Sequence, residues 1–144
     1  MRFLVIACVL LFSLAAHGQS AVRRIDSLTN LIESIDPAAV DTGYKVSYLV
    51  NGYYAAGDWG TSAREFTATK TVGTTNRGTI LRSSKNTNYF WRSADIGSPT
   101  QNIQHWGATS GRSNDASGII SEVIQSGASV VRIPNGSYAL RNTL

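Results

Sequence analysis

Two stretches near the C-terminal end of the chain decide the fold: WGATSGRSNDASGII at residues 106–120 and VVRIPNGSYAL at residues 130–140. The second stretch has β-branched residues, then Pro-Asn-Gly, then an aromatic residue. This order predicts two short strands, over 130–133 and 137–140, joined by a tight turn.

The first stretch predicts a strand over 103–106, a glycine-rich loop over 107–114 and a helix over 115–125. Asp115 is the predicted N-cap, because its carboxylate can accept hydrogen bonds from the free amides of the first turn. Gly127 follows where a left-handed residue commonly ends a helix. The apolar side chains of this helix lie on one face: Ile119, Ile120, Val123 and Ile124.

In this order, the parts resemble the opening of the pectate-lyase-like, single-stranded right-handed β-helix proteins, which include rhamnogalacturonases, epimerases and tailspikes. In that superfamily an aromatic-Gly-Ala strand, a loop, an aspartate-capped helix and a Pro-x-Gly-x-Tyr turn lead into the solenoid, and the helix covers its open end. The sequence departs from the pattern in the loop, where Ser110-Gly-Arg112 replaces a Gly-Asp pair. The resemblance implies that residues 101–144 hold the capping helix and the first rung.

A solenoid needs about three or more repeats, because one rung cannot bury its own apolar face. The chain stops at Leu144 after about one rung. We therefore expect the truncated N-terminal portion of a longer β-helix protein.

The upstream stretches IDSLTNL at 25–31, YLVNGYYAAGD at 48–58 and REF at 64–66 resemble a small helix-plus-strands module that precedes the β-helix in some tailspike-like and bacterial surface proteins. Apolar residues at three- and four-residue steps predict a helix over 22–35, either packed on a sheet or forming a short coiled-coil seam. Further short strands are predicted over 44–50, 65–71, 78–82 and 88–92, with a glycine loop over 52–60 and a linker over 93–100. The predicted fold is thus mostly β with two short helices, with one module over 19–96 and a second over 101–144.

The N-terminus predicts export. Arg2, an apolar run over 3–14 and small residues around Ala16 and Gly18 have the order of a secretory signal peptide over 1–18. The apolar run is too short for a transmembrane helix, which needs about 20 residues, and no later run is longer. We expect a secreted, periplasmic or cell-surface protein with no membrane segment after cleavage.

Composition excludes several classes of function. The single cysteine, Cys8, lies in the predicted signal peptide, so the mature protein would have no disulfide and no thiolate site. The net charge is +4, but the basic residues are scattered singly apart from Arg23-Arg24. Nucleic-acid binding would require a basic cluster, so no nucleic-acid partner is expected.

No catalytic or metal site is predicted, and no cofactor. Glycoside cleavage needs two converging carboxylates, and no spacing brings together any two of Asp58, Glu65, Asp95, Asp115 and Glu122. His105 lacks a nucleophile or metal-binding partner in the sequence and is interpreted as structural. In the family, the catalytic acids lie on rungs farther along the chain.

Tyr53, Tyr54 and Trp59 are the candidate carbohydrate-binding residues. Aromatic rings can stack on sugars, although packing in the core of the small module is the favoured alternative. We therefore expect the N-terminal part of an exported polysaccharide-degrading or polysaccharide-binding protein, itself without a catalytic site. The alternative is a non-catalytic segment that anchors or trimerises a tailspike- or adhesin-type protein, for which the resemblance implies a homotrimer formed through the β-helix.

Overall fold

The computed structural model describes residues 20–40, 46–59, 61–70 and 74–142, and says nothing of the side chains of 112–114. The predicted signal peptide therefore lies outside the described residues. Within the described part of the chain, no helix is both long and apolar enough to cross a membrane.

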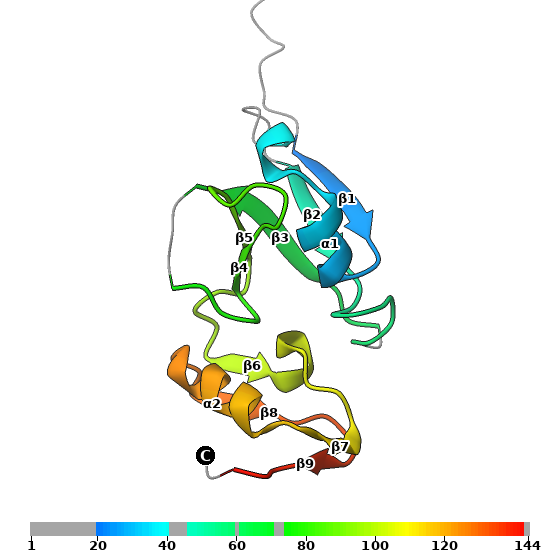
Figure 1. The fold of residues 1–144 in the computed structure, drawn as a ribbon, viewed down its shortest axis with the longest axis vertical. Coiled ribbons are helices and arrows are strands. Elements are labelled where there is room, and N and C mark those ends of the chain that lie inside the picture. The colour runs from blue at the N-terminus through cyan, green and yellow to red at the C-terminus, as the bar shows by residue number, and fades with distance from the viewer. Residues whose placement is uncertain (1–19, 41–45, 60, 71–73, 143–144) are drawn as a thin grey trace, which may run out of the picture.

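The N-terminal half, residues 20–98, is built on a mixed five-stranded sheet in the order β1-β2-β3-β5-β4 (Figure 1). Strand β1 (Ala21–Ile25) pairs in parallel with β2 (Val46–Val50). The other three pairs are antiparallel. Strand β2 pairs with β3 (Arg64–Thr69), β3 with β5 (Phe90–Ser93), and β5 with β4 (Ile80–Arg82).

Helix α1 (Leu28–Ser34) covers one face of this sheet and is followed by a 3-10 turn, η1 (Pro37–Ala39). Leu28 and Leu31 are fully buried in a cluster with aromatic and aliphatic side chains of the sheet. Tyr48 and Trp91 meet edge to face there, with ring centroids 5.4 Å apart. The first hydrophobic core therefore lies between α1 and the sheet.

The predicted helix over 22–35 is wrong in its first part. Residues 21–25 form β1, and α1 begins only after Ser27, whose hydroxyl oxygen accepts a hydrogen bond from Asn30 N at 3.2 Å. Val22, counted in the apolar helical face, is 60% exposed on the strand. Pairing with β2 has overridden the local periodicity.

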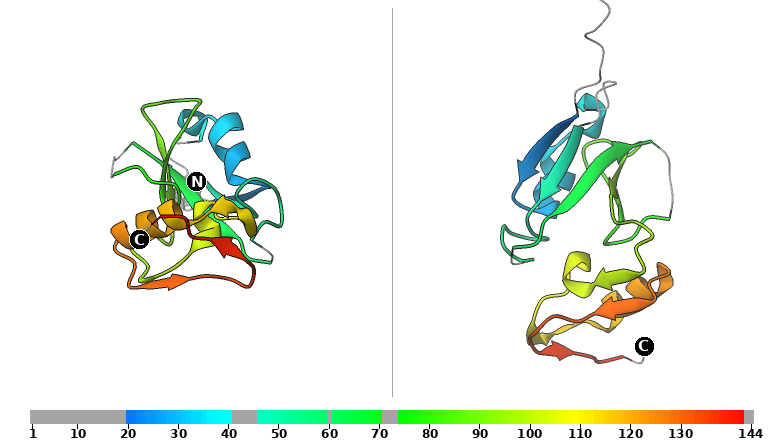
Figure 2. Two further views of the ribbon diagram at one scale, coloured as in Figure 1. Left: turned by 60° about the horizontal axis from the view of Figure 1, so that its bottom comes forward. Right: turned by 180° about the vertical axis from the view of Figure 1, so that it is seen from behind.

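The C-terminal half, residues 99–142, contains two pairs of parallel strands. Strand β6 (Thr100–Asn102) pairs with β8 (Val130–Arg132), and β7 (Gly111–Asp115) pairs with β9 (Tyr138–Ala139). The chain thus passes through β6 and β7 and then returns beside them in the same order, so that β8 lies parallel to β6 and β9 lies parallel to β7. Figure 2 shows from behind that this half lies at one end of the long axis, beyond the five-stranded sheet.

Helix α2 (Ser117–Gln125) and a 3-10 turn, η2 (Ile103–Trp106), supply the second core. Three of the four predicted apolar residues of α2 are buried, whereas Ile124 is 50% exposed. The helix ends at Gln125 with Ser126 as its C-cap, and Gly127 adopts the expected positive φ of 91°.

Three details of this half differ from the sequence-based expectations. Residues 103–106 form η2, because the Asn102 side chain caps the turn through Gln104 N and Gly107 closes it with a φ of 91°. The predicted loop contains β7, which forms only by pairing with β9. Asp115 lies one residue before the cap position, where its carboxylate still accepts from Ser117 N at 3.0 Å.

Over the residues that the structure describes, the fold is mostly β with two α-helices, as predicted, and its sheets are mixed and parallel. Several large apolar side chains of the C-terminal half stay more than half exposed: Val130, Ile133 and Leu140.

Candidate functional site

The structure brings together two of the three predicted carbohydrate-binding residues. The rings of Tyr53 and Tyr54 are 4.7 Å apart and tilted by 58°, and Tyr54 is 58% exposed. Trp59 is only 5% exposed, and its Nε1 donates to the carbonyl of Gln104 at 2.9 Å. Trp59 therefore belongs to the core, and the exposed aromatic surface is that of the tyrosine pair.

The loop that carries the tyrosines is fixed by two residues. A side chain at Gly52 would place its Cβ 1.7 Å from the carbonyl oxygen of Ala55, so only glycine fits there. The carboxylate of Asp58 accepts hydrogen bonds from Tyr54 N and Ala55 N, both at 2.8 Å. This closed loop fixes the backbone at Tyr54, whose ring is exposed to solvent.

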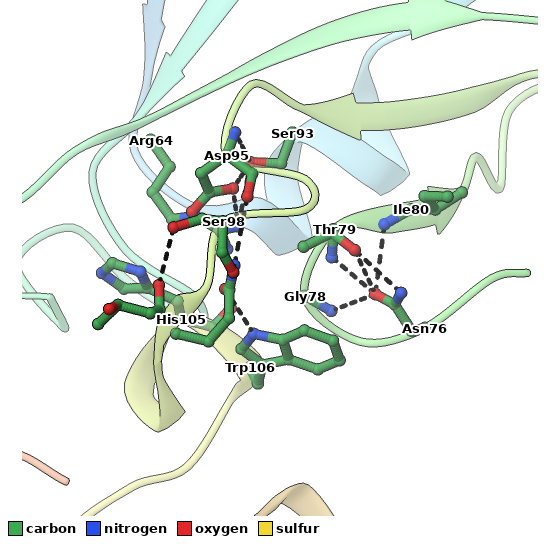
Figure 3. A network of polar contacts seen from close by, with 12 residues as sticks. Arg64, Asn76, Gly78, Thr79, Ile80, Ser93, Asp95, Ser98, His105 and Trp106 are labelled. Carbon is green, nitrogen blue, oxygen red and sulfur yellow. Dashed lines mark hydrogen bonds and ion pairs between the residues drawn. The ribbon is translucent and has the colours of Figure 1, made fainter. Parts of the chain in front are cut away.

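A buried arginine joins the two halves of the molecule (Figure 3). Arg64, 5% exposed, forms a two-pronged ion pair with Asp95 through Nε at 3.0 Å and Nη2 at 2.5 Å. Its Nη1 donates to the carbonyl of His105 at 3.1 Å, across the junction. Burial raises the pKa of Asp95, but the hydrogen bonds and charge of Arg64 outweigh this effect and hold that pKa below its ordinary value.

His105 packs its ring against Trp59, with centroids 5.1 Å apart. Burial, and then the positive charge of Arg64, lower the pKa of His105 to about 4, and the carboxylate of Asp95 opposes them only in part. Among the described residues, its Nε2 atom is buried with no hydrogen-bond partner. The imidazole is therefore neutral at physiological pH.

Trp106 forms the second link between the halves. Its fully buried indole lies against Gly78, where a Cβ would be 2.3 Å from ring atoms of Trp106. The loop holding Gly78 is shaped by Asn76, whose side-chain oxygen accepts from Gly78 N and Thr79 N at 2.9 and 2.7 Å (Figure 3). The indole Nε1 donates to the Gln101 side chain at 3.2 Å.

Four hollows lined by described residues follow the junction between the halves, and we call them together the seam groove. The first, of about 230 Å³, is lined by Tyr53, Tyr54, Asp58 and residues 107–110, and the second, of about 320 Å³, shares Tyr54 with it and adds Arg77. The third, of about 500 Å³, shares Arg77 with the second. The fourth, of about 260 Å³, has these lining residues in common with the third: Thr74, Asn76, Gln125 and Ser126.

The groove is lined by one ion pair and by two further carboxylates, those of Asp58 and Asp115, which accept hydrogen bonds from backbone amides. Arg77 Nε lies 3.0 Å from a carboxylate oxygen of Glu122, and the arginine side chain remains 57% exposed. Burial raises the pKa of Tyr53, and the charge of Glu122 adds to this increase while that of Arg77 opposes it. The rest of the lining is rich in hydroxyl and amide groups, which suit hydrogen bonding to an uncharged polar ligand.

Four of the five carboxylates considered for catalysis are held in separate interactions, and the fifth, Glu65, is exposed on β3. Asp58 shapes the tyrosine loop, Asp95 pairs with Arg64, Asp115 binds Ser117, and Glu122 pairs with Arg77. No group of three or more metal-binding side chains occurs in the part of the chain described.

Sequence reasoning missed the Arg64–Asp95 pair and the seam groove. A signal for the arginine was present, since Arg64 stands two residues before Phe66 and four before Ala68 in an alternating strand. Residues separated by two or four positions in a strand point to the same face, so Arg64 lies on the core face with Phe66. A charged side chain there needs a partner. The groove has no such signal, because it depends on how the halves pack.

Comparisons with known protein families and with curated proteins find no match. Among solved structures, the chain is similar to WceF of Pantoea stewartii, described as a glycan biofilm modifying enzyme with a bacteriophage tailspike-like parallel β-helix fold. The TM-score is 0.51 at 14% sequence identity, and the match covers 75% of this chain and 14% of that chain. The likeness concerns the fold, and it supports a relationship to parallel β-helix proteins.

Proposed function

We propose that this chain is the leading part of a polysaccharide-directed β-helix protein, in which it binds or supports binding and does not itself catalyse a reaction. The observation that carries the proposal is the pairing of β6 with β8 and of β7 with β9. Two successive strands that each receive a parallel partner one circuit later are the arrangement from which a β-helix grows. The likeness to WceF, a glycan-modifying protein, supports the same proposal.

In this proposal the N-terminal half, close to the predicted module over 19–96, is a head that precedes the β-helix. The C-terminal half supplies the first rung of a right-handed β-helix of the pectate-lyase-like type, with α2 as its cap. The exposed Val130, Ile133 and Leu140 are then surfaces on which further strands would pack.

The protein would act outside the cytoplasm, because residues 1–18 have the order of a signal peptide. N-terminal sequencing of the protein produced from its native start tests this point. A product that begins after residue 18 supports export, and a product that retains Met1 contradicts it.

The binding claim is tested by electrophoresis of the purified chain through gels that contain one polysaccharide each, acidic or neutral. We expect the migration of the chain to be slowed by at least one of them, in proportion to its concentration. The same protein should release no product from pectin, polygalacturonate or rhamnogalacturonan. Unchanged migration in every gel contradicts polysaccharide binding, and turnover abolished by a single carboxylate substitution contradicts the non-catalytic role.

A tailspike-type anchoring or trimerising segment is the second candidate. It is favoured by the open edges of β8 and β9, each paired on one side only. Sedimentation of the purified chain separates the candidates, because the anchoring role predicts a homotrimer.

A further inference from the structure

The four hollows of the seam groove are separate, but neighbouring hollows share lining residues, so they lie one after another. Tyr54 joins the first two hollows, Arg77 joins the second to the third, and Gln125 lines both the third and the fourth. Each hollow is lined by residues of both halves, so this line follows the junction between the N-terminal and C-terminal halves. A single small ligand would fill one hollow, whereas a linear polymer would occupy several.

We propose that the seam groove holds a linear segment of polysaccharide, with one sugar ring on Tyr54, a polar sugar substituent at Arg77 and the segment continuing to Gln125. The inference rests on the proposed function and assigns it a site at the junction between the two halves.

The chemistry of the lining fits this ligand. The Tyr54 ring is exposed and held in place by the Asp58-closed loop, so it offers an apolar face at little conformational cost. The Arg77 guanidinium, half-exposed beside Glu122, has hydrogen-bond donors for a hydroxyl or a carboxylate. Gln125, exposed at the end of α2, has both a donor and an acceptor, as a sugar hydroxyl requires.

The walls of the groove are fixed before any ligand arrives. The side chains of Asn76 and Gln101, which also line it, are already engaged in holding their own loops and the Trp106 indole. Arg64 and Trp59 tie the two halves together through hydrogen bonds to the carbonyls of His105 and Gln104. A preformed groove reduces the entropy cost of binding an extended chain.

The inference is tested with the full chain and a ladder of oligosaccharides of increasing length, prepared from a polysaccharide that slows its migration. Titration calorimetry should show affinity rising with length and then levelling off. Tyr54→Ala should weaken binding of all lengths about three- to tenfold, and Tyr54→Phe should retain the affinity, because the ring is kept. Gln125→Ala should weaken only the longer oligosaccharides.

Arg77→Gln distinguishes the two substituents that suit this position. A uronate at Arg77 predicts a loss of about tenfold or more with acidic oligosaccharides, whereas a hydroxyl predicts a smaller loss with neutral ones. Arg82→Gln, on β4, removes the same charge from an exposed position outside the groove and is the matched control. Circular dichroism confirms that each variant is folded.

Binding that persists unchanged in Tyr54→Ala, Arg77→Gln and Gln125→Ala would overturn the seam groove and leave the proposed function intact. Equal losses in Arg77→Gln and Arg82→Gln would also overturn the role of Arg77, because they indicate attraction by net charge alone. Failure to bind any polysaccharide would overturn both proposals.

Discussion

Gly78 is restricted to glycine by the Trp106 indole, not by its backbone conformation. In Gly78→Ala the new Cβ would be 2.3 Å from the ring, so the two halves must move apart or the indole must leave its site. We expect a loss of about 1–3 kcal/mol in the free energy of unfolding, as for other overpacked cores. Urea denaturation followed by tryptophan fluorescence measures it.

Gly118→Ala is the control for that substitution. Gly118 lies in α2, and a Cβ there would meet no atom within 4 Å apart from its chain neighbours and the backbone of its own helix. The variant should gain about 0.5–1 kcal/mol, because alanine loses less backbone entropy in a helix than glycine. Equal stability of Gly78→Ala and the wild-type chain would show that the Trp106 contact is not tight.

His105 predicts a loss of stability in mild acid. Its pKa is about 4 in the folded protein, against about 6.5 when unfolded. Between these values the unfolded chain binds a proton that the folded chain does not, so stability is complete above about pH 6.5 and falls as the pH drops toward 4. For this partly solvent-screened group we expect a loss of about 1–2 kcal/mol.

Urea denaturation at pH 7 and pH 4.5 tests this in the wild type and in His105→Phe, which keeps a ring against Trp59. The variant should lose less stability over the interval. Asp95 and Asp115 have lowered pKa values, so their contributions are lost only at more acidic pH. An identical pH dependence in both proteins would contradict the assignment to His105.

The candidate site was predictable only in part at the level of residues. Tyr53 and Tyr54 were found because a glycine-rich loop with adjacent aromatic residues has a recognisable composition. The burial of Trp59 was not decided by the sequence, because it depends on a hydrogen bond to Gln104, 45 positions along the chain. Contacts of that separation leave no local pattern.

At the scale of elements, the boundary between β1 and α1 depends on Ser27. Its buried hydroxyl accepts from Asn30 N, so Ser27→Ala leaves a first-turn amide without its cap. We expect a loss of about 1 kcal/mol in urea denaturation. Ser34→Ala, exposed at the other end of the same helix, should change stability by less than about 0.5 kcal/mol. Similar losses in the two variants would contradict a capping role.

Elements set by local chemistry were predicted well, and those set by distant partners were not. Helix α2 was predicted to within two residues at its start, because its apolar spacing and terminal glycine are local features. Strands β1 and β7 were missed because each pairs in parallel with a strand more than twenty residues away. The turn η2 did have local signals, Asn102 and Gly107, that were outweighed by β-prone neighbours.

At the scale of the whole molecule, the two halves should differ in protection from hydrogen exchange. The β2, β3 and β5 strands pair on both sides and cover the first core, whereas β8 and β9 pair through three and two residues. We expect amides in β2, β3 and β5 to exchange slowly and those over 130–139 to exchange quickly, or the chain to self-associate through that end. Slow, concentration-independent exchange over 130–139 in a monomer would contradict this.

The turn η2 also has a mechanical consequence. Three consecutive residues of η2 are each held by a different part of the N-terminal half: Gln104 by Trp59, His105 by Arg64 and Trp106 by the Gly78 loop. Rotating one half against the other about the long axis would strain all three attachments at once. The joint should therefore have high torsional stiffness, so that a torque applied to one half turns the molecule as a rigid body instead of twisting it at the middle.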